Sequence, residues 1–140
     1  MVEMPAPQIE KVHGPARRAI VKGLRDYNVA TAGKFDHHPL TVTIREGGRI
    51  VGGLAGEIFW GWMFVSLLWV SDKHRGHGHG SALMRTAEAE ARSRGVRNVY
   101  LDTFSFQAPE FYAKLGYREF ARLDEFPPGH RRVWMTKALG

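Results

Sequence analysis

The chain has 140 residues, of which 44% are hydrophobic, and this length and composition suit one domain with a single core. It contains no cysteine, which excludes disulfides, thiolate zinc sites and a cysteine nucleophile. No run of about 18 apolar residues is present, and residues 1–8 lack the apolar region of a signal peptide. We therefore expect a single-domain protein, residues 1–140, that lies in the cytoplasm and does not associate with a membrane.

The formal net charge is +6, from 20 basic and 14 acidic residues, so a nucleic-acid partner has to be weighed. The basic residues are spread along the chain and interleaved with acidic ones, and no Lys/Arg-rich block is present. We interpret the charge as a solvated surface with a positive cofactor groove, and expect no nucleic-acid partner. A basic nucleic-acid-binding domain is the alternative, and salt-sensitive gel shifts would reveal it.

The first half of the chain is predicted to form a helix and three strands. Gly14-Pro15 opens a helix whose apolar residues recur at helical spacing up to Tyr27, and residues 28–38 form a loop with at most a short second helix. Two strands follow, residues 41–45 and 50–59, joined by a hairpin turn. The third strand, residues 62–70, is apolar at nearly every position, which predicts burial on both faces.

The second half is predicted to form two helices and three strands. A helix over residues 82–94 ends at Gly95. Because this helix is a crossover connection, the strand after it, residues 96–102, should run parallel to residues 62–70. The remaining elements are a short helix from Pro109 to Gly116 and an antiparallel pair of strands, residues 117–123 and 131–137. The order of elements predicts a mixed α/β fold.

The turn R-G-H-G-H-G-S at residues 75–81 joins a strand to the start of a helix. Glycines let the backbone approach a ligand, and the first helical turn offers unpaired N–H groups and a favourable dipole for an anion. An arginine at the mouth of the turn adds a full positive charge. We expect a pyrophosphate to bind at this turn, formed by Arg75, Gly76, His77, Gly78, His79, Gly80 and Ser81.

Two common phosphate-binding patterns fit this turn poorly. The P-loop requires a lysine before its serine or threonine, and Gly80-Ser81 has none. The dinucleotide fingerprint G-x-G-x-x-G requires its third glycine one position after Gly80. Asp102, at the end of the next strand, does lie about where an acidic ribose ligand would. A dinucleotide-binding fold is therefore the runner-up.

The turn does fit a third pattern, [QR]-x-x-G-x-[GA], and residues 108–117, A-P-E-F-Y-A-K-L-G-Y, look like A-x-x-F-Y-x-x-x-G-[FY]. On these two motifs the chain resembles the GNAT superfamily, the acyl-coenzyme A-dependent N-acyltransferases, over roughly residues 40–140. The resemblance implies a mostly antiparallel sheet with a central, splayed parallel strand pair flanked by helices. It also implies direct transfer of an acetyl group from acetyl-coenzyme A to a primary amine in a ternary complex.

The resemblance further implies roles for individual residues. The backbone of Leu68, Trp69 and Val70 would pair with the pantetheine arm. Tyr112 would lie beside the coenzyme sulfur and protonate the leaving thiolate as general acid. Many family members have an asparagine seven residues before this tyrosine; Ser105 stands there in this chain, and Gln107 is a nearby substitute for its contact with the coenzyme.

The general base is left open by the sequence. Glu57 is the only carboxylate between Gly47 and Val70, so we assign it this role, although it also suits an exposed position on an alternating strand. His37 and His38 are further candidates, because histidine exchanges protons near neutral pH. A substrate amine of low pKa would need no strong base.

Three further readings concern histidines, aromatic residues and assembly. His74, His77 and His79 could together bind a metal ion, but the glycine turn should splay them, so we predict no metal.

Aromatic residues around the second hairpin and the later strand favour a small-molecule amine of apolar or aromatic character: Phe59, Trp60, Trp62, Phe64, Phe104 and Phe106. A peptide or protein amine, and a non-catalytic acyl-coenzyme A sensor, are the alternatives. An edge strand that needs cover predicts a homodimer.

Overall fold

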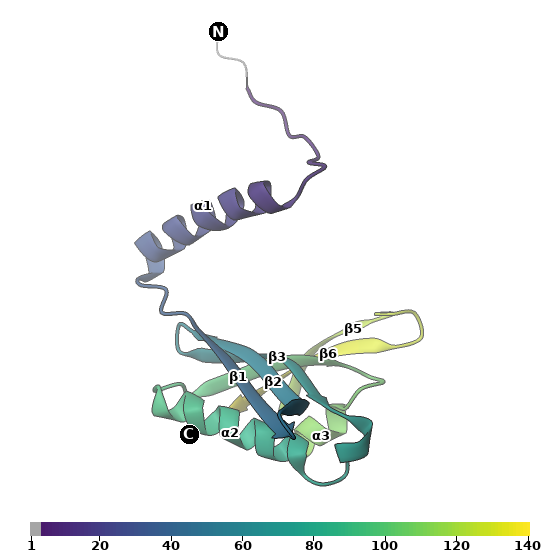
Figure 1. Ribbon diagram of the computed structural model, residues 1–140. Coiled ribbons are helices and arrows are strands. Elements are labelled where there is room, and N and C mark those ends of the chain that lie inside the picture. Colours follow the sequence, from purple (N-terminus) through teal and green to yellow (C-terminus); the bar gives the residue numbers. More distant parts are fainter. Residues whose placement is uncertain (1–3) are drawn as a thin grey trace. The chain divides into compact units, whose positions relative to one another are not determined.

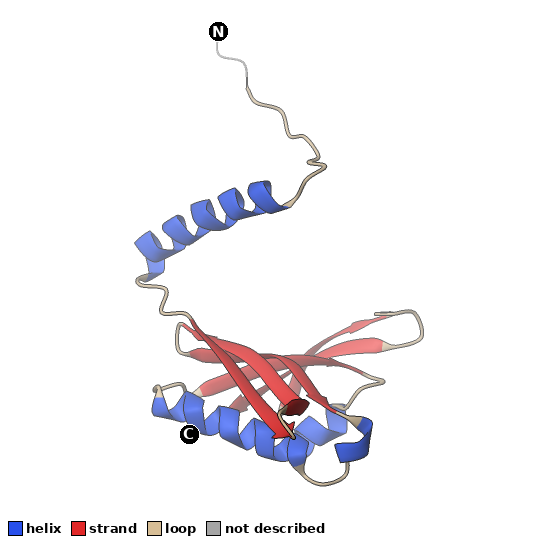
Figure 2. Ribbon diagram, in the orientation of Figure 1, coloured by secondary structure: helices blue, strands red, loops and turns tan. Residues whose placement is uncertain are grey.

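The computed structural model describes residues 4–140, and Figures 1 and 2 show its elements. The described chain divides into two compact units, one that ends at Phe35 and one that spans Asp36–Gly140. The first holds one helix, and the second holds the sheet and the remaining helices. One domain over residues 1–140 therefore stays a prediction. No helix in the described part of the chain is long and apolar enough to cross a membrane.

The first helix, α1 (Gly14–Ala32), begins as expected with proline in its first turn. It continues past Tyr27 to Ala32, so the predicted loop over residues 28–38 is too long, and no second helix follows. The reason lies in the sequence, because neither glycine nor proline interrupts the chain between Tyr27 and Gly33. No residue of α1 is buried.

The unit of residues 36–140 is built on a six-stranded sheet with the order β1-β2-β3-β4-β6-β5. Only the β3–β4 pair is parallel; the other neighbouring strands are antiparallel. The predicted mixed α/β fold is confirmed. The strands are β1 (His38–Glu46), β2 (Arg49–Phe59), β3 (Trp62–Val70), β4 (Asn98–Phe104), β5 (Arg118–Asp124) and β6 (Arg131–Ala138).

Two α-helices and a short 3-10 turn, η1 (Asp72–His74), complete this unit. The crossover helix α2 (His79–Ser93) and the shorter α3 (Pro109–Lys114) lie on the same face of the sheet (Figure 2). The core forms between that face and the helices, and its largest fully buried side chains come from β2, β3, β4 and α2: Leu54, Met63, Val99, Leu101, Leu83 and Met84.

The end of α2 shifts the following strand by two residues. Gly95, with φ of 78°, donates its N–H to the carbonyl of Arg92, and Val96 donates to the carbonyl of Ala91. These two bonds form a Schellman motif, which keeps residues 96 and 97 in the turn. β4 therefore begins at Asn98 and extends beyond Asp102 to Phe104.

The prediction that β3 is buried on both faces is wrong. Met63 and Val65 are buried, but Trp62, Leu67 and Trp69 are 40%, 67% and 51% exposed. An apolar run is typical of a strand covered on both faces, whereas the helices of this unit cover one face of the sheet (Figure 2). The outward-facing side chains of β3 therefore line an open aromatic surface and a groove.

Candidate active site

The parallel strands β3 and β4 separate halfway along their length. Their pairing begins at Trp62↔Asn98 and ends at Val65↔Leu101. Beyond that point β3 continues to Val70 against β2, and β4 continues to Phe104 against β6. Residues 66–70 of β3 therefore have no strand partner on the β4 side, and their backbone groups can pair with an extended ligand.

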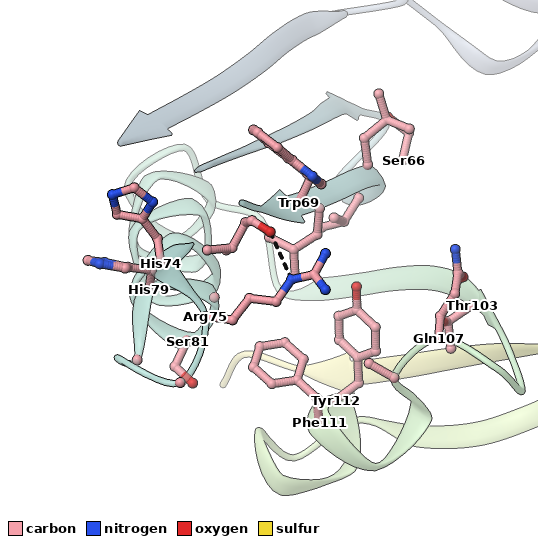
Figure 3. A pocket seen from close by; sticks show the side chains of 18 of the residues that line it. Ser66, Trp69, His74, Arg75, His79, Ser81, Thr103, Gln107, Phe111 and Tyr112 are labelled. Atoms are coloured by element: carbon pink, nitrogen blue, oxygen red, sulfur yellow. Dashed lines mark hydrogen bonds between the residues drawn. The ribbon is translucent and has the colours of Figure 1, made fainter. Parts of the chain in front are cut away.

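A groove of about 860 Å³ occupies this opening, within the usual size range of small-molecule sites (Figure 3). One wall is β3 from Val65 to Val70, which includes the predicted Leu68, Trp69 and Val70. The glycine turn closes one end. The other wall comes from the end of β4, the loop after it and α3, through Asp102, Thr103, Phe106, Gln107, Ala108, Phe111 and Tyr112.

The glycine turn presents the start of α2 to this groove. Gly76 and Gly78 have φ of 79° and 81°, the left-handed conformation that glycine adopts without strain. Gly78 is the N-cap of α2; no side chain caps the helix, and its first turn holds no acidic residue. The first backbone N–H groups and the helix dipole are thus directed at the groove, and no capping or acidic side chain competes with a ligand for them. This arrangement suits the binding of a pyrophosphate.

Arg75 lies across the mouth of the groove. Its Nε donates to the carbonyl of Val70 at 3.0 Å, and its Nη1 lies 3.0 Å from Oδ1 of Asp72. Figure 3 shows the guanidinium reaching over the groove, between Trp69 and Tyr112. A full positive charge therefore stands beside the unpaired backbone of β3.

The three histidines of the turn have different environments. His79 and His74 line the groove, whereas His77 does not. The Nδ1 of His74 lies 2.6 Å from Ser71 Oγ, and its Nε2 lies 2.6 Å from the Glu46 carboxylate. The hydrogen bond with His74 lowers the pKa of Glu46. The carboxylate partner of His74 is thus Glu46, whereas Asp72 pairs with Arg75. No group of three possible metal-ligating side chains occurs over residues 4–140.

Tyr112 lies at the inner wall of the groove, and its hydroxyl points toward Arg75 in Figure 3. Tyr112 is 8% exposed, and its ring packs edge-on against Phe111 and Tyr117, with centroids 5.1 and 6.0 Å away. Burial, together with the charge of Asp102, raises the pKa of Tyr112 to about 12. The phenol therefore keeps its proton at neutral pH and can donate it.

The two residues considered for the asparagine contact are placed differently. Gln107 lines the groove, and its Oε1 accepts hydrogen bonds from the N–H of Phe104 at 2.9 Å and the hydroxyl of Thr103 at 3.2 Å. Ser105 is not among the groove-lining residues. Its hydroxyl accepts from the N–H of Arg131 at 3.0 Å, so it joins the end of β4 to the start of β6. Its contact with a coenzyme stays a prediction.

The structure brings together two of the candidate bases. Nε2 of His37 lies 2.6 Å from Oε2 of Glu57, and the ring of His37 approaches Phe59 with centroids 6.4 Å apart. His38 lies apart from this pair, 3.2 Å from Asp36. Glu57 is paired in register with Phe64 of β3, so it stands on the sheet beside the groove and outside its lining.

Asp102 lines the groove, although the sequence suggested it only as a ribose ligand of the runner-up reading, a dinucleotide-binding fold. Its Oδ1 accepts from Nε of Arg132 at 2.8 Å and from Nη2 at 2.6 Å. A sequence signal for Asp102 does exist. It lies near the end of the strand that follows the glycine turn and its helix, and this is where a splayed strand pair opens.

Aromatic rings cover the sheet next to this opening. Phe64 and Tyr100 stack with centroids 4.8 Å apart, and Trp62 meets Tyr100 edge-on at 6.0 Å. Phe104 stacks on Phe106, which lines the groove, at 5.4 Å. These rings border the groove, and the preference for an apolar or aromatic amine that the sequence favours stays a prediction.

Comparison with known proteins agrees with this geometry. The family model described as Acetyltransferase (GNAT) family matches residues 7–117. The blasticidin-S acetyltransferase of Streptomyces morookaense is 39% identical over 134 residues, which cover 95% of this chain and 97% of that protein. The crystal structure of an acetyltransferase from Bacillus cereus is 32% identical, with a TM-score of 0.86 over 94% of this chain and 97% of that one.

The fold also resembles an aminoglycoside 6'-N-acetyltransferase crystallised with coenzyme A. That structure has a TM-score of 0.64 and 21% identity, and the match covers 73% of each chain. At this identity the likeness concerns the fold.

Proposed function

The chain belongs to the GNAT family of acetyltransferases, and on that premise we propose that it moves an acetyl group from acetyl-coenzyme A to a primary amine of a small molecule. The observation that carries the proposal is the groove between the splayed strands, with an uncapped helix start at one end and the Tyr112 phenol on its wall. These features suit two parts of an acyl-coenzyme A, the pyrophosphate and the thioester.

The coenzyme would be held mainly by backbone groups. The turn from Arg75 to Ser81 would bind the pyrophosphate through helix N–H groups and the guanidinium. The β3 backbone at residues 68–70, which has no strand partner on the β4 side, would pair with the amides of the pantetheine arm, although the carbonyl of Val70 already accepts from Arg75. Gln107 has its carbonyl oxygen engaged within the loop, so its NH₂ group can donate to the coenzyme.

The transfer needs one proton removed and one supplied. The amine nitrogen attacks the thioester carbonyl, the C–N bond forms and the C–S bond breaks, and the nitrogen loses a proton. Tyr112, which burial keeps protonated at neutral pH, gives its proton to the departing sulfur. The Glu57–His37 pair takes up the proton of the amine, through water, and thereby combines two of the three bases that the sequence left open.

The acceptor is proposed to be a small molecule because the relative with 39% identity is named for blasticidin S, and because aromatic rings border the groove. A peptide or protein amine is the second candidate acceptor, and a non-catalytic acyl-coenzyme A sensor is the second candidate function. We further propose that the protein works in the cytoplasm as a homodimer.

The test is release of free thiol from acetyl-coenzyme A across a panel of amines that includes blasticidin S. A chain without cysteine gives no thiol background. Longer acyl donors belong in the same assay, because they measure the depth of the pocket. Thermal stabilisation by acetyl-coenzyme A without thiol release for any small amine or peptide would favour the sensor and contradict the enzyme.

A further inference from the structure

Resting on the proposed transfer, the geometry points to Asp102 as the residue that binds the protonated amine of the acceptor. It also points to the class of acceptor, a small positively charged amine with a flat unsaturated body. The carboxylate would hold the ammonium group at the opening of the groove, and the aromatic surface of the sheet would hold the body. Before the nitrogen attacks, the ammonium would lose one proton, through water, to the Glu57–His37 pair. The second proton, released as the amide forms, would return to Tyr112 after that phenol has protonated the sulfur.

The position of Asp102 is the first observation. It follows Leu101, the last residue of β4 that pairs with β3, so it stands where the strands part. It shares the groove wall with Tyr112, and its charge contributes to the raised pKa of that phenol. A nitrogen bound to this carboxylate would therefore lie close to the group that protonates the leaving sulfur.

The second observation is that the Asp102 carboxylate is fixed in place. Arg132 donates twice to Oδ1, and its guanidinium lies over the rings of Phe104, Phe126 and Trp134 at 5.3, 5.2 and 4.9 Å. The aspartate side chain is 15% exposed. Both of these contacts are to Oδ1, and Oδ2 is the oxygen that would accept from an ammonium.

The third observation is the surface beside it. Tyr100 precedes Asp102 by two residues on β4, so both side chains point to the same face of the sheet. Phe64 stacks on Tyr100, and Trp62 meets it edge-on. Burial raises the pKa of Tyr100, and the charges of Glu57 and Asp102 add to this effect, so both carboxylates act on this ring. Aromatic faces next to negative charge favour a flat cation.

The competing explanation is that Asp102 only anchors Arg132 and thereby joins β4 to β6. The two roles differ in what they predict for kinetics. A structural anchor affects all substrates alike through stability, whereas an ammonium-binding carboxylate affects protonated amines and spares neutral ones.

The experiment compares wild type with Asp102→Asn, using amines that are protonated at neutral pH, such as benzylamine, and neutral aryl amines, such as aniline. Asp124→Asn is the matched control, since Asp124 is also paired with an arginine on the sheet but lies on β5, away from the groove. The double variant Asp102→Asn, Arg132→Gln leaves no uncompensated charge if the single variant folds poorly.

For protonated amines we expect kcat/KM to fall about 10- to 100-fold in both Asp102 variants, mostly through a raised KM for the amine. For neutral amines, and for the KM of acetyl-coenzyme A, we expect changes below about threefold. Equal losses for both classes of amine would overturn this inference, as would no loss for either class or a wild-type preference for neutral amines. Each of these results would leave the proposed function intact. A wild-type protein that binds acetyl-coenzyme A yet acetylates no amine overturns the proposed function, and the inference with it.

Discussion

At the scale of single residues, the hydroxyl of Tyr112 is expected to matter for chemistry and little for stability. Tyr112→Phe removes one oxygen that has no hydrogen-bond partner over residues 4–140, so the fold and coenzyme affinity should persist. General-acid assistance contributes typically ~10²–10⁴-fold, so kcat should fall at least ~10-fold even if water partly substitutes. Single-turnover rates are the measurement, because slow product release would hide the effect in kcat.

Tyr117→Phe is the matched control for this substitution. The Tyr117 hydroxyl donates to the buried Glu88 at 2.8 Å and lies outside the groove lining. Its loss should lower the melting temperature and leave the single-turnover rate unchanged. Wild-type rates in Tyr112→Phe would reduce Tyr112 to a packing residue.

The same burial of Tyr112 predicts weaker stability at alkaline pH. The folded protein holds this proton up to a pKa of about 12, whereas the unfolded chain releases it near 10.0. Between these values the folded state binds more protons, so the free energy of unfolding falls as the pH rises. The contribution is complete below about pH 10 and amounts to roughly 3 kcal/mol.

Urea unfolding at several values between pH 8 and 11.5 measures this dependence. Burial and the hydrogen bond to Glu88 raise the pKa of Tyr117 as well, so its contribution has the same sign. Burial raises the pKa of Tyr100 too, so the decline should be shallower in Tyr112→Phe, which lacks one of these three tyrosines. Identical slopes in the variant and the wild type would show that Tyr112 does not contribute to it.

At the scale of elements, the turn before α2 is expected to bind the coenzyme through its backbone. Gly78→Val places a branched side chain at φ of 81° beside the groove, and should abolish thermal stabilisation by acetyl-coenzyme A. The left-handed conformation itself costs roughly 1–2 kcal/mol for an L-residue, so the variant will also be less stable.

Gly95→Val controls for that strain. Gly95 has φ of 78° and, like Gly78, open space around its missing side chain, but it lies in the turn after α2, away from the groove. Both variants should lose similar stability, and only Gly95→Val should still gain stability from acetyl-coenzyme A. A stabilised Gly78→Val would remove the turn from the binding site.

The sequence predicted the elements well where local signals are strong. The parallel β3–β4 pair followed from the crossover helix, and Pro15 and Pro109 marked helix starts. Two errors have different causes. The apolar run of β3 cannot distinguish a core from an exposed aromatic surface, because a local pattern does not report tertiary surroundings. The shift of β4 is local, because it follows from the hydrogen bonds of Gly95 and Val96 to carbonyls of α2.

At the scale of the whole molecule, long-range pairs were the part of the site that the sequence could not supply. His37 and Glu57 were separate candidates, and their contact depends on the register of β1 with β2. Asp102 belongs to the site because β3 and β4 diverge beside it and because Arg132, thirty residues later in the chain, fixes its carboxylate. Motifs identify residues that act through the local backbone, whereas side-chain pairs across a sheet require its topology.

The edge of the sheet at β5 supports the homodimer expected from the sequence. All seven residues of β5 are exposed, including Phe120 at 54% and Leu123 at 51%, and the strand pairs only with β6. An exposed edge with apolar side chains is a template for another chain, so natural proteins usually cover or charge it. We expect a second copy to cover it, and light scattering should give the mass of a dimer at micromolar concentration.

The variant that tests this is Phe120→Lys, Leu123→Lys, which adds two like charges to the edge and should yield a monomer that keeps its fold. Ile50→Lys is the control, because Ile50 is a comparably exposed apolar residue, at 44%, near the β1–β2 turn and far from β5 in the strand order. It should leave the dimer intact. A wild-type monomer, or a dimer that survives both lysines, would show that β5 is not the interface.

The monomeric variant also tests whether the dimer helps to hold Asp102 in position, because Leu123 pairs with Arg132, and Arg132 binds Asp102. If it does, the KM for protonated amines should rise on dissociation while that for acetyl-coenzyme A stays constant.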